Sequence, residues 1–275
     1  MKDKHKFKVK VNREMMLLLT IILLGASISV TAPEFLQYKN LCNILANNAI
    51  FGIMSIGMMF IIVTGNIDVS VGAQFAVVGI IAGLFANYAD NIGLKTPLAV
   101  FLVSVTVGIM LGYINGFLIT KIKLPAVIIT LGTSSIMRGF LLQLTEGQWV
   151  ATIPRWLSKA VNSKAAGIYV SAYIWIIIAV LVYLVFKFTM FGRNILAMGG
   201  NPIGAVRIGI SQEKIYKFVF IISGALIGIG GTIYVAQLGS AQPVAGVGYE
   251  MKLVAAAILG GNSFSGGKAS VTGTC

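Results

Sequence analysis

The stretch from Gly261 to Ser270, GNSFSGGKAS, is the part of the sequence whose residue types most suggest chemistry, because glycine-rich loops ending in Gly-Lys bind phosphate groups. Two positions do not fit that motif. Asn262 stands where the motif has its first glycine, and Ala269 stands where a serine or threonine would contact Mg²⁺. A dinucleotide-binding G-x-G-x-x-G is also missing from the sequence. We therefore expect no nucleotide-driven motor within this chain and no bound cofactor.

Cysteine and histidine offer no catalytic or metal-binding arrangement either. The two cysteines, Cys42 and Cys275, have no metal or disulfide spacing, and the single histidine, His5, lies in a lysine-rich N-terminal segment. A membrane enzyme would need a nucleophile with its base, or a set of metal ligands. The sequence therefore predicts a protein that is not an enzyme.

Polar side chains inside long apolar runs are the remaining candidates for function. Asn47, Asn48, Asn115 and Thr133 are neutral and could line a hydrated path for an uncharged, polyhydroxylated solute. Hydrogen bonds between helices explain the same residues equally well. Asp68 is the acidic residue nearest to an apolar run, and two roles stay open for it: a cap on the following helix, or a contact with solute or ion.

Charge within the apolar runs is rare. None of the eight acidic residues falls in the middle of a helix that we predict, although a proton-coupled transporter normally buries at least one. Arg138 does lie inside a predicted helix, where it either extends toward the membrane surface or pairs with a polar group. We favour the pairing.

The amino-acid composition indicates the class of protein to which these polar residues belong. Hydrophobic residues make up 57% of the 275 positions and charged residues only 11%, against about 25% charged in soluble domains. The mean hydropathy is +0.91. The formal net charge of +13 would suggest nucleic-acid binding in a soluble protein, but here the basic residues gather at the ends of apolar runs. The chain is therefore predicted to be an all-α, polytopic membrane protein that binds no nucleic acid.

A membrane-spanning helix needs about 20 apolar residues, and seven runs qualify. They are 15–32, 43–63, 71–87, 97–120, 125–144, 171–188 and 215–237. An eighth run, Met251–Leu259, is too short to span and leads into glycines, which predicts a re-entrant or broken helix. With the N-terminus inside, the cytoplasmic segments carry 13 Lys and Arg and the outer loops carry five, so the N-terminus and residues 189–214 are predicted to be cytoplasmic.

Glycines recur at four-residue spacing at Gly108, Gly112 and Gly116, and again at Gly224 and Gly228. Small residues at this spacing let helix backbones approach closely in lipid. Packing within one subunit is favoured over a dimer face.

Several blocks together resemble the permeases of ribose-type ABC transporters. Thr64–Gly72, TGNIDVSVG, resembles the family's T-G-G-I-D-L-S-V-G block. The further blocks that match, in order along the chain, are Leu124–Gly132 followed by Arg138-Gly139, then Phe191–Pro202, Leu238–Pro243, Gly248–Glu250, Leu259–Gly261 and Ser265–Gly267.

The resemblance implies a permease that dimerises, docks ATP-binding subunits on the cytoplasmic side and receives its solute from an extracytoplasmic binding protein. It also implies a cytoplasmic coupling segment, whose matching residues are Gly200, Asn201, Pro202, Ala205, Arg207 and Gly209. The family's leading Glu and first Ala are replaced here by Ile203 and Gly204.

The predicted organisation is a cytoplasmic basic tail over residues 1–14 and a permease domain over 15–275, with the coupling loop at 189–214. The resemblance further implies that the C-terminal part of the family domain is missing. The expected function is import of a monosaccharide such as ribose, driven by ATP in a partner, across the cell membrane of a prokaryote. The alternatives are import of autoinducer-2 by the same family and, from another class, an ion-coupled secondary transporter.

Overall fold

The computed structural model describes the backbone of residues 13–275 and, apart from residues 13–15 and 17, the side chains as well. Most of the predicted basic tail therefore lies outside the described residues. The chain divides into two units between Leu41 and Cys42. The first unit holds α1 (Arg13–Thr31), a short 3₁₀ helix (Pro33–Leu36) and the first turn of α2 (Tyr38–Val63).

The second unit is a bundle of helices, and helices form in all of the regions that hydropathy predicts. After α2 come α3 (Val71–Asn91), α4 (Pro97–Ile122), α5 (Ala126–Thr145), α6 (Arg155–Asn162), β1 (Lys164–Ala165), β2 (Ile168–Tyr169), α7 (Val170–Phe188), α8 (Met190–Gly200), α9 (Pro202–Arg207), α10 (Gln212–Leu238), α11 (Tyr249–Leu259) and α12 (Val271–Thr274). Among the described residues, six helices are long and apolar enough to cross a membrane: α2, α3, α4, α5, α7 and α10. The all-α, multi-pass membrane architecture is confirmed.

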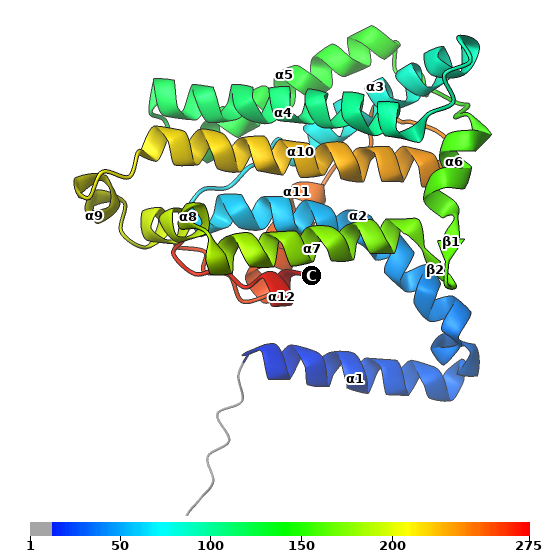
Figure 1. Ribbon diagram of the computed structural model, residues 1–275, viewed down its shortest axis with the longest axis horizontal. Coiled ribbons are helices and arrows are strands. Elements are labelled where there is room, and N and C mark those ends of the chain that lie inside the picture. Colours follow the sequence, from blue (N-terminus) through cyan, green and yellow to red (C-terminus); the bar gives the residue numbers. More distant parts are fainter. Residues whose placement is uncertain (1–12) are drawn as a thin grey trace, which may run out of the picture. The chain divides into compact units, whose positions relative to one another are not determined.

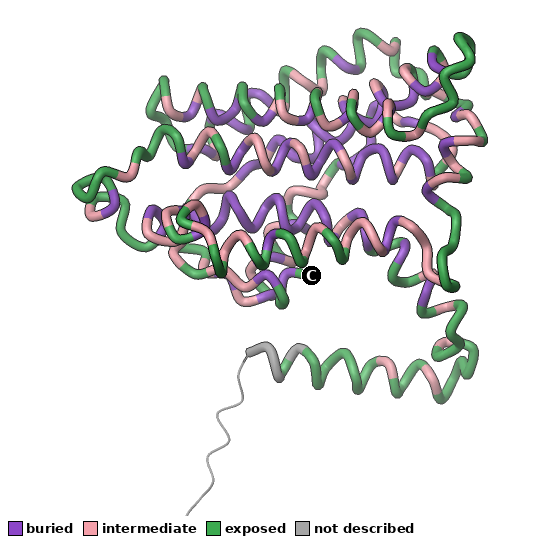
Figure 2. Tube along the Cα trace, viewed as in Figure 1, coloured by how far each residue is buried: buried purple, intermediate pink, exposed green. Residues whose placement is uncertain are grey.

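The core of the bundle is the second half of α2. Every residue from Gly52 to Val63 is buried, and Figure 2 shows this helix in purple among its neighbours. Because its residues are apolar on all sides, α2 has no face that needs water. It thus forms the centre around which α3, α7 and α10 are placed.

Helices α4 and α10 pack backbone against backbone. A methyl group added at Gly108 would overlap the carbonyl oxygen of Gly224, and one at Gly112 would overlap the carbonyl oxygen of Phe220. The four-residue glycine spacing therefore brings two backbones of the same chain together. Packing within the subunit is confirmed for these glycines.

Different short elements lie at the two ends of the bundle. The connection from α7 to α10, with α8 and α9, forms one end, and α6 with the β1–β2 hairpin forms the other (Figure 1). Lys121 and Lys123 follow α4 at the α9 end. Within the second unit, the two segments that the charge count assigns to the cytoplasm thus lie at the same end.

The last part of the chain is a broken segment. α10 ends at Gly239 in a left-handed conformation, residues 240–248 are not helical, and α11 is only 11 residues long. The glycine-rich loop that follows returns to α2, where the N–H of Gly267 donates to the carbonyl of Val63 at 2.9 Å. The prediction of a short or broken helix here is confirmed.

Candidate functional site

Asp68 lies in the connection between α2 and α3 and is completely buried. Its Oδ1 accepts from the Ser70 N–H at 2.8 Å and from the Ser70 hydroxyl at 2.5 Å, and its Oδ2 accepts from Gln74 Nε2 at 3.0 Å. Asn115 of α4 donates to the Ser70 hydroxyl at 2.7 Å. We call Asp68, Ser70, Gln74 and Asn115 the Asp68 network.

The Asp68 network is closed to solvent, since all four residues have no exposed surface. Burial raises the pKa of Asp68 from 3.8 to about 6, and the hydrogen bonds from Ser70 and Gln74 offset part of that effect. Two buried acceptors, Gln74 Oε1 and Asn115 Oδ1, have no hydrogen-bond partner among the described residues. The network ties the start of α3 to α4.

Of the predicted path residues, the structure brings only Asp68 and Asn115 together. Asp68 makes the contact expected of a cap, with the N–H of Ser70 as donor, and Asn115 is part of the same buried network. Asn47 and Asn48 are exposed in the first half of α2, where Asn48 donates to its own helix at Ile44. Thr133 is buried and donates to the Thr130 carbonyl. The five residues therefore do not form one cluster in this structure.

Arg138 pairs with backbone rather than with an acid. Its Nη1 donates to the carbonyl oxygens of Pro243 at 2.8 Å and Ala245 at 2.9 Å, in the non-helical segment before α11. These carbonyls belong to irregular backbone inside the bundle, which needs donors wherever water is excluded. The predicted pairing of Arg138 is confirmed.

Sequence reasoning missed the position of the first turns of α11. The Tyr249 ring packs against Phe51 in a tilted arrangement, with ring centroids 4.8 Å apart, and Phe51 is near the middle of α2. Glu250 and Lys252 follow directly, and the Lys252 ammonium lies 5.8 Å from the centre of the Phe51 ring, beside the middle of α2. Glu250 lies in the first turn of α11, outside every predicted spanning helix; hydropathy did not register its position beside α2. Only the contact with α2, which is distant in sequence, reveals it.

The predicted coupling residues form a compact turn. The Asn201 side chain accepts from the Gly204 N–H at 2.9 Å and begins α9, and Gly209, with φ +88°, ends it in a conformation suited to glycine. Ala205 is only 3% exposed and faces the bundle. The exposed side of this turn carries Ile203, Val206 and Ile208 instead.

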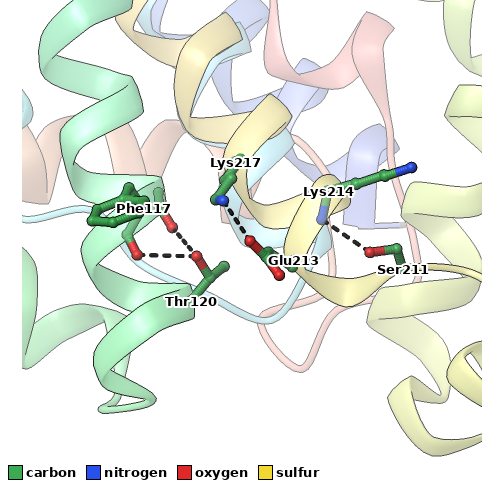
Figure 3. A network of polar contacts seen from close by, with 7 residues as sticks. Phe117, Thr120, Ser211, Glu213, Lys214 and Lys217 are labelled. Carbon is green, nitrogen blue, oxygen red and sulfur yellow. Dashed lines mark hydrogen bonds and ion pairs between the residues drawn. The ribbon is translucent and has the colours of Figure 1, made fainter.

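Beside α9 the bundle opens into a cleft of about 780 Å³. Its lining comes from the α4–α5 turn, from α9 and from the start of α10, and includes Asn66, Thr120, Lys123, Val206, Ser211 and Tyr216. Figure 3 shows the ion pair of Glu213 with Lys217 at this place, and Ser211 accepting from the Lys214 N–H at 3.3 Å. Asn66 belongs to the connection that carries Asp68, so the cleft borders both α9 and that connection.

Metal chemistry has no ligand set in the described part of the chain. Within residues 13–275, His, Cys, Asp and Glu form no group of three or more that could hold a metal ion.

Comparison with known proteins places these features in a family. Residues 40–274 match the family model described as branched-chain amino acid transport system / permease component. The ribose import permease protein RbsC of Haemophilus influenzae is 35% identical over 260 residues, which cover 93% of this chain and 79% of that protein. The autoinducer 2 import system permease proteins LsrC of Salmonella typhi and Escherichia coli are each 32% identical, over 95% of this chain and 74% and 75% of their own lengths. No solved structure matches.

Proposed function

This chain belongs to the permease family of branched-chain amino acid transport systems, and from that membership we propose that it is the membrane-spanning subunit of an ATP-driven importer of a monosaccharide such as ribose. The ribose permease among its relatives supports the choice of solute. Uptake of autoinducer-2, the solute named for the other relatives, is the second candidate. An ion-coupled carrier is less well supported, because the buried carboxylate of Asp68 is held by three donors from its own surroundings.

The observation that carries the proposal is the exposed apolar side of α9. Ile203 and Ile208 are 70% and 75% exposed on a short turn at the end of the bundle that we assign to the cytoplasm. Large apolar side chains exposed outside the membrane mark a protein interface. We assign this surface to a groove of an ATP-binding subunit, so that movements of the partner reach α10 through α9.

The opposite end supports an outer partner. Arg155, Lys159 and Lys164 are exposed on α6 and the hairpin. A solute-binding protein with an acidic rim would complement this charge and be steered to it. We propose that the N-terminus is cytoplasmic, in a prokaryotic cell membrane, and that two permease copies form the transporter.

Uptake is the direct test of function. Proteoliposomes that contain this chain, its ATP-binding subunit and its binding protein should import D-ribose only when ATP is supplied to the cytoplasmic side. Import that follows a proton gradient without ATP would favour the secondary carrier. A cysteine introduced at Gln212 should resist an impermeant thiol reagent in intact cells, while one at Lys164 should react; the reverse pattern would overturn the orientation.

The α9 assignment has its own test. Ile203→Glu together with Ile208→Glu would place charges in the docked groove without touching the bundle, so recovery of the ATP-binding subunit in co-purification should fall at least about tenfold. Glu146→Lys, at an exposed site near the other end, serves as control. Undiminished recovery of the double variant would remove the coupling role from α9.

A further inference from the structure

Four aromatic rings meet in the middle of the bundle, each from a different helix. The Tyr249 ring lies 4.8 Å from that of Phe51 and 5.3 Å from that of Phe75, and Phe75 lies 5.0 Å from Tyr234. Phe75 is buried, while Phe51, Tyr234 and Tyr249 keep part of their surface open. We call these four rings, with Glu250 and Lys252, the aromatic–charge cluster.

Two charged groups border the rings. The Lys252 ammonium lies 5.8 Å from the centre of the Phe51 ring and 5.6 Å from that of Tyr249. Within residues 13–275, neither Lys252 nor Glu250 has an oppositely charged atom within 4.0 Å, although the Arg138 guanidinium is near enough to interact electrostatically with Glu250. The hydroxyls of Tyr234 and Tyr249 likewise accept or donate no hydrogen bond in the described chain.

Charged side chains without an ion-pair partner are unusual beside the middle of a spanning helix. A charged side chain facing hydrocarbon at mid-membrane costs about 3 kcal/mol on insertion scales. Lys252 is exposed in this chain, and Phe51, its contact, is near the middle of α2. Contact of this surface with lipid is therefore unfavourable, and the Lys252 ammonium needs water or a polar group beside it.

We propose that the aromatic–charge cluster is a contact site for the transported sugar within the membrane. This inference rests on the proposed function and names where the solute is held during passage. Aromatic rings cover the apolar C–H face of a sugar, and few but well-placed polar groups fix its orientation. Here Lys252 and the tyrosine hydroxyls donate to sugar oxygens, and Glu250 accepts from sugar hydroxyls.

Saturation-transfer NMR, which detects weak binding, tests this site on the full chain in detergent by following magnetisation transfer from protein protons to sugar protons. D-ribose should receive saturation from aromatic protons of the wild-type protein. Tyr249→Leu removes the central ring and should weaken binding about tenfold, whereas Tyr249→Phe, which keeps the ring, should retain most of it. Tyr88→Leu removes an exposed ring elsewhere, one that lies 6.4 Å from Phe85, and should change nothing.

Lys252→Ala is a second variant that should weaken D-ribose binding without unfolding the protein, because Lys252 is exposed and its removal leaves the four rings in place. Equal saturation of D-ribose in wild type, Tyr249→Leu and Lys252→Ala would overturn the site. Binding of L-leucine in place of D-ribose would overturn the sugar assignment as well. Ring-dependent binding of D-ribose without ATP-driven uptake would uphold the site and reject the proposed function.

Discussion

The Asp68 network and the aromatic–charge cluster are both polar groups inside an apolar bundle, yet their surroundings are opposite. Asp68 is completely buried and its two oxygens accept three hydrogen bonds from neighbours within six residues. Glu250 and Lys252 follow a non-helical segment, keep exposed surface and have no ion-pair partner in the described chain. A buried polar group whose hydrogen bonds all come from its own chain holds helices together. A polar group without such partners indicates contact with a molecule outside the chain.

The largest expected effect is on the closed network. Asp68→Leu leaves the Ser70 N–H without its acceptor and the Gln74 amide with the Ser70 hydroxyl alone, and each buried donor group that loses its bond to Asp68 costs about 2 kcal/mol. The free energy of unfolding should therefore fall by about 4 kcal/mol. Thermal unfolding of the purified chain in detergent measures it.

Lys252→Leu is the matched change in the open cluster and should alter that free energy by no more than about 0.5 kcal/mol, because an exposed side chain is replaced. Similar losses in both variants would remove the distinction between the two groups.

The second effect is a dependence on pH. The pKa of Asp68 is raised to about 6 in the folded protein, so the folded state holds this proton more tightly than the unfolded state does. Its contribution to stability is greatest below about pH 4, decreases as pH rises to about 6, and is constant above, with a total change of roughly 3 kcal/mol. Unfolding measured from pH 4 to 7 should show this decrease in the wild type.

The side chain of Asp68→Asn cannot titrate. Its amide can donate to Gln74 Oε1, which has no hydrogen-bond partner among the described residues of the wild type. The difference in stability between wild type and this variant should therefore follow pH, favouring the wild type most at low pH. A difference that is the same at pH 4 and pH 7 would show that Asp68 is ionised throughout.

The smallest effect concerns Gln74. Gln74→Met loses the bonds to Asp68 Oδ2 and to the Ser70 hydroxyl, 3.0 and 2.8 Å long, but also removes an unpaired buried oxygen. The two contributions partly cancel, and we expect a net loss of about 1 kcal/mol. A loss as large as that of Asp68→Leu would mean that Gln74, rather than Asp68, organises the network.

Prediction from sequence succeeds where the signal is local. Hydropathy finds the spanning helices because lipid requires long apolar runs, and the contact of Asp68 with Ser70 spans only two residues. Helix ends are less well predicted, since α2 begins at Tyr38 instead of residue 43 and α10 at Gln212 instead of Ile215. Polar residues continue these helices beyond the apolar run, which hydropathy does not register.

The rest depends on contacts between distant parts of the chain. Asn115 reaches Ser70 across 45 positions, so no spacing rule distinguishes it from Asn47. The aromatic–charge cluster joins α2, α3, α10 and α11, and neither Glu250 nor Tyr249 belongs to a run that hydropathy assigns to the membrane. The burial of Ala205 likewise follows from how α9 lies on the bundle.

The glycine contact between α4 and α10 also sets an order for biosynthesis. Gly108 and Gly224 are 116 positions apart, so a ribosome adding about 5–20 residues per second delivers the second helix roughly ten seconds after the first. Until then, the glycine side of α4 lies in the membrane without its partner. The insertion machinery must therefore hold an incomplete bundle during this interval, and a larger side chain at Gly108 would keep α10 from packing against α4 when it arrives.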